Sequence, residues 1–590
     1  MNIFMLLSLI GGLALFLYGM DTMSAGLAKL TGGKLQKILQ SLTSNKWKAC
    51  ALGAVVTAII QSSSATTVMV VGMVNSGILK LTQVAGIIFG ANIGTTATSW
   101  ILSLSGLRGE SFFVQLFKPT TFSPILGIVG VILIMAGNKP FKKDIGRIMI
   151  GFAILMFGMN AMSDAVEPLG EIPEFAQIMT LFSNPILGVL MGAVVTAVIQ
   201  SSSASVGILQ ALSMTGSLSY ASTIPIILGQ NIGTCATSLI SSLGTNKNAK
   251  AAAFIHLYFN IIGTVLFLAA YLFALAFLDM QFLGSVTTPV GIAVIHSIFN
   301  VVSTVILMPF AEKITDLATF TVYGKEPIPE MEDSTLNKLD PLFLSNPSFA
   351  VQQARQVANE MGKKCYNALV MSYDLIQNYN PGVHEEIIRI EQKVDNYEDH
   401  LGSYLVKLSA LELSESDNRI ITIIMNSISD WERISDHVAT ISDNCKDKHD
   451  NHGIFSSAAL AEMKVYQEAL TDIMNKTVTA FETMDLNLAS EIEPLEEVID
   501  KINSKVKKKH VKRLQKGICS IDMGLILMNI ATSYERISDH CSNIGASMIE
   551  IMEDDYETHQ YLTDIREDEH YKNLVKEYRK KYQLPAKKAV

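Results

Sequence analysis

Two runs of small polar residues interrupt long apolar stretches of the sequence. The first run comprises Gln61, Ser62, Ser63, Ser64 and Thr66, and the second comprises Gln200, Ser201, Ser202, Ser203 and Ser205. In an apolar, membrane-like surrounding each unpaired hydroxyl or amide costs about 1–3 kcal/mol, so these groups need partners. Helix packing spreads small residues at a four-residue spacing. A contiguous cluster instead indicates a turn or an unwound tip.

A second pair of strings complements the first. GANIGTTATS occupies residues 90–99, and GQNIGTCATS occupies residues 229–238. The glycines around each Asn predict a break in a membrane helix, where exposed backbone groups are tolerated if they line a cavity. Helix N-termini would attract an anion, and carbonyls and hydroxyls would suit Na⁺. No Lys, Arg, Asp or Glu occurs in these strings, so bound cations are expected to offset the charge of an anion.

These strings belong to an internal duplication with a constant offset of 139 residues. GAVVTAIIQSSSAT at 53–66 recurs as GAVVTAVIQSSSAS at 192–205, and LFLYGMDTMS at 15–24 recurs as ILMFGMNAMS at 154–163. Chance similarity of apolar segments does not produce shared polar strings in a fixed register. Asn160 stands where the first copy has Asp21, so a charged role for Asp21 is unmatched; a solvated residue at a span end is the favoured interpretation.

Segment lengths predict how the chain crosses a bilayer. Residues 49–79 would form a straight helix of about 46 Å, well beyond a hydrocarbon core of about 30 Å, so a re-entrant hairpin with the polar run at its tip is expected. Full spans are expected near 3–20, 82–105, 121–137, 149–162, 222–242, 252–274 and 289–310. Two inverted copies with re-entrant hairpins are the predicted architecture.

The charges flanking the spans predict the orientation. The first span is followed by Lys29, Lys34, Lys37, Lys46 and Lys48, whereas the matching loop of the second copy carries Asp164, Glu167, Glu171 and Glu174. Lys139 and Lys142 precede the second copy, and Asp279 lies in a later loop. Because positive loops stay in the cytoplasm, the two copies run in opposite directions. The N-terminus is expected outside the plasma membrane and the C-terminal region in the cytoplasm.

Composition divides the 590 residues into two parts. Residues 1–320 hold 15 Lys and Arg and 10 Asp and Glu, whereas the remainder holds 31 and 45. The expected organisation is a membrane domain over 1–320 (copies 1–138 and 139–310), a linker over 321–346, a helical domain over 347–555 with bundles at 347–450 and 455–555, and a charged tail over 556–590. The overall charge of −9 excludes a strongly basic nucleic-acid binder.

The C-terminal region repeats itself as well, with DWERISDHVATI at 430–441 matching SYERISDHCSNI at 533–544. Four E-x-x-x-D pairs occur: Glu391 with Asp395, Glu432 with Asp436, Glu496 with Asp500, and Glu535 with Asp539. A helix places such carboxylates on one face, where they repel each other unless a cation lies between them. A metal site and a solvated acidic face both remain open, and no Cys or His cluster with zinc spacing accompanies the pairs.

The duplicated QSSS strings, the paired GANIGTT and GQNIGTC segments and ERISDH resemble the type II sodium/phosphate cotransporter family, in its bacterial form with a PhoU-like domain. The resemblance implies Na⁺-coupled transport of inorganic phosphate, with Gln61–Ser64 and Gln200–Ser203 at the substrate and sodium site. Thr66, Asn92, Thr95, Asn231 and Thr234 carry over as supporting ligands. A divalent or iron- or zinc-type metal is implied on the PhoU-like domain.

Three functions remain open. The first is sodium/phosphate cotransport, and the second is phosphate export or transport of another oxyanion. The third is a membrane-anchored regulator whose helical bundles dock onto a partner; a homo-oligomer is also compatible with the sequence. An enzyme is not expected, because no nucleophile, base and orienting group occur together. His256 in HLYFN and His296 in HSIFN favour structural hydrogen bonds over proton relay.

Overall fold

The computed structural model describes residues 3–31, 45–106, 118–137, 140–277, 280–324, 335–553 and 569–585. Lys34, Lys37, Lys139, Asp279, residues 325–334 of the predicted linker and residues 556–568 of the predicted tail lie outside these ranges. The chain divides into a first unit, Met1–Phe349, and a second unit, Ala350–Val590. Both are helical, and the described residues contain one isolated β-bridge, between Ser219 and Val286.

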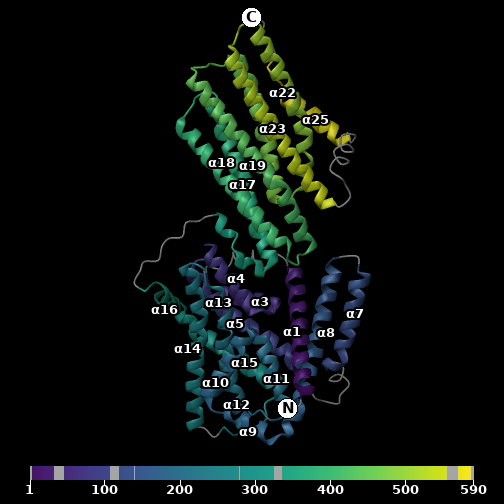
Figure 1. The fold of residues 1–590 in the computed structure, drawn as a ribbon, viewed down its shortest axis with the longest axis vertical. Helices are drawn as coiled ribbons and strands as arrows, with labels where there is room; N and C mark the ends of the chain where they lie inside the picture. Colours follow the sequence, from purple (N-terminus) through teal and green to yellow (C-terminus); the bar gives the residue numbers. More distant parts are fainter. Residues whose placement is uncertain are drawn as a thin grey trace. The chain divides into compact units, whose positions relative to one another are not determined.

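The first unit contains seven helical segments that are long and apolar enough to span a membrane (Figure 1). Their helices are α1 (Ile3–Thr31), α5 (Leu81–Ser103), α7 (Pro119–Ala136), α8 (Pro140–Val166), α12 and α13 (Tyr220–Gly233 and Cys235–Ser241), α14 (Lys247–Phe277), and α15 continuing into α16 (Pro289–Leu307 and Ala311–Tyr323). Their number equals that of the predicted spans. The shorter helices are α3 (Lys46–Ile60), α4 (Ser63–Asn75), α9 (Pro173–Leu181), α10 (Pro185–Ile199) and α11 (Ser202–Ser213).

Helices α1 and α8, which occupy equivalent places in the two copies, pack against each other (Figure 1). A Cβ added to Gly12 would lie 3.0 Å from the carbonyl oxygen of Gly158, and one added to Gly19 would lie 2.7 Å from that of Gly151. The start of α1 therefore meets the later part of α8, so the helices are antiparallel. Because Gly151 and Gly158 are the counterparts of Gly12 and Gly19, a local two-fold axis relates the contacts.

Glycines also show the direction of α3 relative to α5. A Cβ on Gly90 would overlap the carbonyl oxygen of Cys50, and one on Gly94 would lie 2.5 Å from that of Ala54. Later residues of α5 meet later residues of α3, so the two helices are parallel and begin on the same side of the unit. Helix α4 connects the end of α3 to the start of α5, so it must run back to the side on which both helices begin. The second copy has the same arrangement of α10, α11 and α12, through Gly229 beside Val189 and Gly233 beside Ala193.

The predicted helix break at GANIGTT is wrong. Helix α5 runs without interruption from Leu81 to Ser103, and in the second copy Thr234 keeps helical backbone angles between α12 and α13. Gly90 and Gly94 lie four residues apart, and because they lack side chains, α3 can approach the backbone of α5 closely. These glycines thus follow the small-residue packing pattern of membrane helices, and the α5 backbone remains hydrogen-bonded.

The end of the predicted linker packs within the first unit. The short helix η6 (Pro341–Ser345) contacts α4, and the fully buried Phe343 fills the space left by Gly72, where a Cβ would lie 2.8 Å from the ring. Asn75 at the end of α4 donates a hydrogen bond to the Asp340 carboxylate at 2.5 Å. The return helix of the first hairpin is therefore attached to the segment that precedes the second unit.

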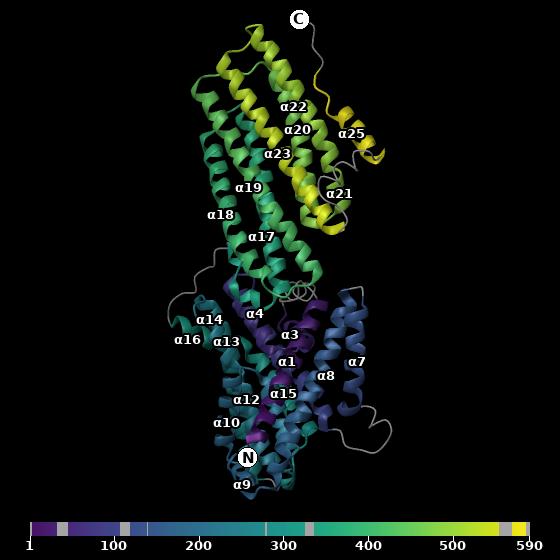
Figure 2. The same ribbon diagram turned by 45° about the vertical axis from the view of Figure 1, so that its right-hand side comes forward.

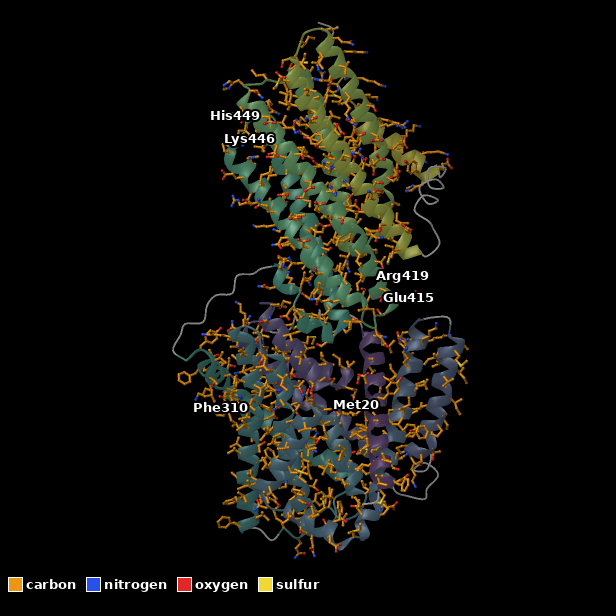
Figure 3. All side chains as sticks on the ribbon, viewed as in Figure 1. Met20, Phe310, Glu415, Arg419, Lys446 and His449 are labelled. Carbon is orange, nitrogen blue, oxygen red and sulfur yellow. The ribbon has the colours of Figure 1, made fainter. Side chains whose placement is uncertain are left out.

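The second unit contains three long helices for each sequence copy, as predicted (Figure 2). They are α17 (Pro347–Leu375), α18 (Pro381–Ser409) and α19 (Glu415–Asp450), then α20 (Ser457–Thr483), α22 (Ile492–Gln515) and α23 (Ile521–Glu553). Helix α19 extends from Glu415 and Arg419 to Lys446 and His449 (Figure 3). Two shorter helices, α21 (Leu486–Ser490) and α25 (Glu569–Lys581), complete the unit, and α25 packs against α22.

Candidate functional site

Each polar run forms a turn between the two helices of a hairpin. Gln61 has a φ of 59°, and Gln200 has a φ of 57°, so both occupy the left-handed region that non-glycine residues seldom adopt. Their backbone N–H groups donate to Thr57 O and Thr196 O, both at 2.8 Å, and so end α3 and α10. Strained backbone of this kind costs about 1–3 kcal/mol and is concentrated at functional sites. Its recurrence at matching positions points to a shared purpose.

The serine after each glutamine starts the returning helix. Ser62 Oγ accepts a hydrogen bond from the N–H of Ala65, and Ser201 Oγ accepts one from the N–H of Ala204, both at 3.2 Å. Helix α4 begins at Ser63 and helix α11 begins at the matching Ser202, so these serines lie in the first turn of each helix. First-turn N–H groups have no intrahelical acceptor, so each tip presents backbone donors as well as hydroxyls.

The two tips meet at one cavity of about 340 Å³. It is lined by Gln61, Ser62, Ser63, Ser64, Gln200, Ser201, Ser202 and Ser203, together with Leu17, Met20, Asp21 and Ser24 of α1. Met20 is labelled on α1 in Figure 3. The structure thus brings together the eight predicted Gln and Ser residues, 139 positions apart in sequence. The volume lies within the usual range of ligand pockets.

The charges around the cavity are few. Among the described residues that line it, no Lys or Arg occurs, and Asp21 carries the sole ionisable side chain. The N-termini of α4 and α11 each contribute about half a positive charge. An oxyanion is therefore offered backbone N–H groups and hydroxyls, and the carboxylate of Asp21 is available to a cation. Asp21 is exposed, as the sequence interpretation of a solvated residue expects, and it also lines the cavity.

Hydroxyl groups on neighbouring helices brace the tips. Thr98 of α5 donates to Gln61 Oε1 at 3.0 Å, and Thr57 donates to Thr66 Oγ1 at 3.1 Å across the first hairpin. The second copy shows Thr237 donating to the carbonyl oxygen of Gln200 at 3.4 Å and Thr196 donating to Ser205 Oγ at 2.8 Å. Thr98 and Thr237 were missed as site residues, although their matching positions in the duplicated strings could have identified them.

The other predicted supporting ligands lie outside the cavity lining. Thr95 and Thr234 hydroxyls donate to carbonyl oxygens one helical turn earlier, Ala91 O and Gln230 O. Asn92 accepts a hydrogen bond from Asn260 at 3.4 Å, and Asn231 accepts one from Asn300 at 3.3 Å. Their participation in ion binding stays a prediction.

Asn260 and Asn300 form a second symmetric feature that the sequence interpretation did not use. Both are fully buried, and their Oδ1 atoms have no hydrogen-bond partner among the described residues. The signal was the repeated H-x-x-x-N of HLYFN and HSIFN. His256 lies within 3.1 Å of Ser238 Oγ through its Nδ1, in line with the structural interpretation of that histidine.

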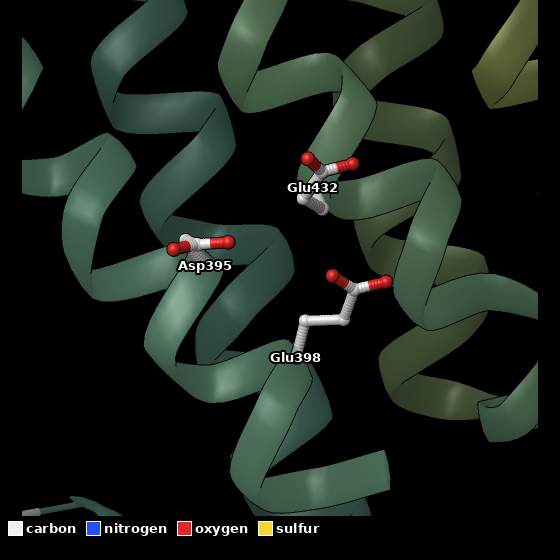
Figure 4. A group of neighbouring side chains, drawn as sticks. All are labelled: Asp395, Glu398 and Glu432. Carbon is white, nitrogen blue, oxygen red and sulfur yellow. The ribbon is translucent and has the colours of Figure 1, made fainter.

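The acidic pairs of the second unit gather into two groups. Carboxylate oxygens of Asp395, Glu398 and Glu432 lie within 4.8 Å of one another, and so do those of Glu496, Asp500 and Asp539 (Figure 4 shows the first group). Of the eight predicted metal ligands, the structure leaves Glu391, Asp436 and Glu535 outside these groups. Glu535 is paired with Lys507 at 3.0 Å. Glu398 was missed because Asn503 occupies its place in the second copy.

Burial and then mutual repulsion raise the proton affinity of several of these carboxyl groups. Burial, followed by repulsion from Asp436, raises the pKa of Glu432 to about 7. Burial and then Glu535 raise the pKa of Asp500, and burial and then Asp500 raise that of Asp539. Clustered carboxylate oxygens are ligands that hard divalent cations prefer, so the residues present fit such an ion.

Comparison with known proteins places the chain in a family. Residues 15–164 and 166–294 match the Na⁺/Pi-cotransporter family. The uncharacterized protein YqeW of Bacillus subtilis (strain 168) is 30% identical over 254 residues, which cover 43% of this chain and 78% of YqeW. The chain belongs to the Na⁺/Pi-cotransporter family. It is thus a multi-pass membrane protein of a transporter family and not an enzyme.

Other relatives of this Na⁺/Pi-cotransporter family member share different parts of it. The "Putative inorganic phosphate export protein YjbB" of Escherichia coli (strain K12) is 23% identical over 562 residues, or 94% of this chain and 99% of YjbB. The sodium-dependent phosphate transport protein 2A of Rattus norvegicus is 29% identical over 171 residues, which cover 28% of this chain and 26% of that protein.

The C-terminal unit carries the second family match. Residues 358–445 and 466–548 match the PhoU domain. Among solved structures, PhoU from Pseudomonas aeruginosa aligns with 34% of this chain and 97% of its own, at 19% identity and a TM-score of 0.33. The matches to the two family models show that this Na⁺/Pi-cotransporter family member combines a helical membrane unit with C-terminal PhoU domains.

Proposed function

We propose that the chain transports inorganic phosphate across the plasma membrane through the cavity between the two polar tips. The observation that carries the proposal is that Gln61–Ser64 and Gln200–Ser203 line one cavity together with the N-termini of α4 and α11. A tetrahedral oxyanion requires several convergent donors, and serine hydroxyls and first-turn N–H groups supply them without a fixed positive charge. Such a site can release its ligand, which transport requires.

Export is the proposed physiological direction. In support, the chain aligns along nearly its whole length with a protein named as a phosphate exporter, which shares both its membrane and its C-terminal parts. Each tenfold gradient is worth about 1.4 kcal/mol per ion, so an inward sodium gradient opposes outward cotransport. A sodium-coupled cycle therefore exports phosphate only when the outward phosphate gradient is steep enough to exceed that opposition.

Sodium is proposed as the coupling ion. Asp21 lines the cavity, and the buried Oδ1 atoms of Asn260 and Asn300 are hard oxygen donors next to Asn92 and Asn231. In a dry interior an amide oxygen without a donor is costly, and a bound Na⁺ would satisfy it. Two symmetric positions of this kind support sodium binding.

The asymmetry of the cavity supports alternating access with inverted copies and re-entrant hairpins. Helix α1 contributes Leu17, Met20, Asp21 and Ser24, whereas the matching residues of α8 are Met156, Met159, Asn160 and Ser163. Met156 and Met159 are fully buried in the core. We infer that α8 replaces α1 at the cavity in the oppositely facing state, because inverted copies exchange roles during such a cycle. An N-terminus outside the cell and cytoplasmic PhoU domains complete the proposed orientation.

The acidic groups of the PhoU domains are proposed as divalent-cation sites. Asp395, Glu398 and Glu432 would hold one ion, and Glu496, Asp500 and Asp539 would hold another. A bound cation would neutralise repelling carboxylates and fix α18 to α19 and α22 to α23. Regulation of transport by the PhoU domains, with or without a further protein partner, is part of the same proposal.

Efflux from proteoliposomes tests the transport proposal. Vesicles containing the purified protein and labelled phosphate should lose phosphate faster than protein-free vesicles, and faster with internal Na⁺ than with internal K⁺. Arsenate, also a tetrahedral oxyanion, should inhibit phosphate efflux more strongly than dicarboxylates do. Inhibition by sulfate, which has the same shape, shows whether the site distinguishes anions by charge. Equal efflux rates with Na⁺ and K⁺ would contradict sodium coupling. Phosphate loss no faster than from protein-free vesicles would contradict phosphate transport.

A further inference from the structure

A second cavity, of about 600 Å³, lies in the PhoU-domain unit between α22 and the end of the described chain. One wall is a single face of α22 that carries Lys501, Lys505 and Lys509 beside Val498 and Ile502. The opposite wall comprises Arg579 of α25 and the residues that follow it, Tyr582, Gln583, Leu584 and Pro585. Figures 1 and 2 both show α25 alongside α22.

The wall formed by α25 is held in place by specific contacts. Tyr571, Tyr578 and Tyr582 are buried, and their hydroxyls donate to Glu497 at 2.9 Å, Glu491 at 3.2 Å and Asp472 at 2.6 Å. Lys509 Nζ donates to Pro585 O at 3.2 Å, so the last described residues are attached across the cavity mouth. These contacts make the cavity a defined feature of the fold.

The cavity carries an excess of positive charge. Its lining includes four cationic side chains and, among the described residues, no acidic one. The carboxylates that pair with lining cations are each shared by two of them or by a neighbour: Glu497 contacts both Lys501 and Arg579, and Glu462 contacts Lys509 at 3.3 Å and Arg513 at 2.8 Å. Two carboxylates are thus shared by four cations. Lys505 is exposed and has no carboxylate partner within the described ranges.

The spacing of the lysines indicates the shape of an anion that would fit them. Four residues correspond to about 6 Å along a helix, so Lys501, Lys505 and Lys509 form a row about 12 Å long. A single phosphate cannot contact both ends of such a row, whereas linked phosphates present negative charge at intervals along it. Charge-assisted hydrogen bonds from ammonium groups to phosphate oxygens are among the strongest that proteins make.

We propose that this cavity binds an oligophosphate, meaning a linear chain of phosphoryl groups, between α22 and α25. The ligand is either an inorganic oligophosphate or the phosphate tail of a nucleotide, since both present the same chemistry to the lysine row. Bound there, it bridges α22 and the C-terminal helix and stabilises their contact. The site is independent of the transport cavity and is measured by binding, without any flux.

Calorimetric titration of the full-length protein in detergent at physiological ionic strength tests the proposal. Tripolyphosphate should bind saturably with one site per chain. Lys505→Gln should weaken this binding about tenfold, because it removes one ammonium from the middle of the row. Lys508→Gln is the matched control: it removes the same charge from an exposed position on α22 that does not line the cavity, and should leave the affinity nearly unchanged.

The choice of ligand separates the sources. Tighter binding of tripolyphosphate than of ATP supports an inorganic ligand, and tighter binding of ATP supports a nucleotide. Orthophosphate should also bind at the transport cavity, and Lys505→Gln should leave that binding unchanged. If Lys505→Gln weakens orthophosphate binding as much as it weakens tripolyphosphate binding, the proposal is overturned, because no chain of phosphates is then needed at the lysine row. Equal losses in Lys505→Gln and Lys508→Gln would also overturn it, since they would show general attraction to a basic helix. Unchanged melting temperatures establish that both variants are folded.

Discussion

At the scale of single residues, the two hairpin tips combine strain with capping. Gln61 and Gln200 adopt left-handed backbone conformations, and the serines that follow them cap the returning helices. The serines at each tip therefore differ in role although they are adjacent and chemically identical. Ser62 holds the N-terminus of α4, whereas Ser63 lies in the first turn and lines the cavity.

Ser62→Ala should destabilise the protein by about 1 kcal/mol, because Ala65 N–H loses its acceptor. Ser64→Ala is the control, since Ser64 lines the same cavity without capping the helix. Thermal unfolding in detergent measures the difference. Equal melting temperatures for the two variants would contradict the assignment of Ser62 as the cap.

The raised pKa of Glu432 predicts a pH dependence of the metal-free protein. The folded state holds this proton up to a pH of about 7, whereas the unfolded chain releases it near its ordinary value of about 4.5. Stability should therefore fall as pH rises from about 5 to 7.5. Glu432→Gln should flatten this dependence, and a divalent cation should restore stability at pH 7.5 in the wild type more than in the variant. A melting temperature that rises with pH over this range would contradict the prediction.

At the scale of helices, sequence lengths and flanking charges predicted the hairpins and the number of spans. The role of the glycines was not predictable, because the sequence pattern Gly-x-x-x-Gly occurs both in broken helices and in close contacts between helices. What distinguishes them is the partner: α3 lies against Gly90 and Gly94, and the sequence does not state which helix faces which. The place of Asp21 beside the polar tips was not predictable for a similar reason, since only the fold shows that α1 passes the tips.

Gly90→Ala should therefore disrupt the contact between α3 and α5. The added Cβ would overlap Cys50 O, and backbone cannot move aside as a flexible side chain can, so we expect a loss of at least about 1–3 kcal/mol. Gly11→Ala on α1 is the control, because no atom lies within 4 Å of the new Cβ; it should be neutral or gain up to about 1 kcal/mol. Comparable stability of the two variants would contradict the packing role of Gly90.

The attachment of η6 to α4 makes a second prediction at this scale. Phe343→Ala should destabilise the protein by about 3–5 kcal/mol, because it empties the space beside Gly72. Phe310→Ala removes the same ring from an exposed position, 49% accessible and labelled in Figure 3, and should cost much less. Thermal unfolding compares them. Equal melting temperatures of the two variants would contradict a stabilising contact between η6 and α4.

At the scale of the whole molecule, two duplications serve different purposes. The membrane copies are antiparallel at α1 and α8, so their tips can face one cavity from related directions. The PhoU-domain copies instead assemble three helices each and bring carboxylates of neighbouring helices together. The two membrane copies thus line one cavity jointly, whereas each PhoU-domain copy gathers an acidic group of its own. The role of the cavity residues in binding stays a prediction.

The central claim is that both polar tips form one phosphate site. Phosphate efflux from proteoliposomes, measured as a function of internal phosphate for Ser63→Ala, Ser202→Ala and the wild type, tests it most directly. Each single substitution should raise the half-saturating phosphate concentration several-fold without lowering the melting temperature, because each tip contributes donors to the same anion. Wild-type kinetics in either variant would contradict a site shared by the two copies.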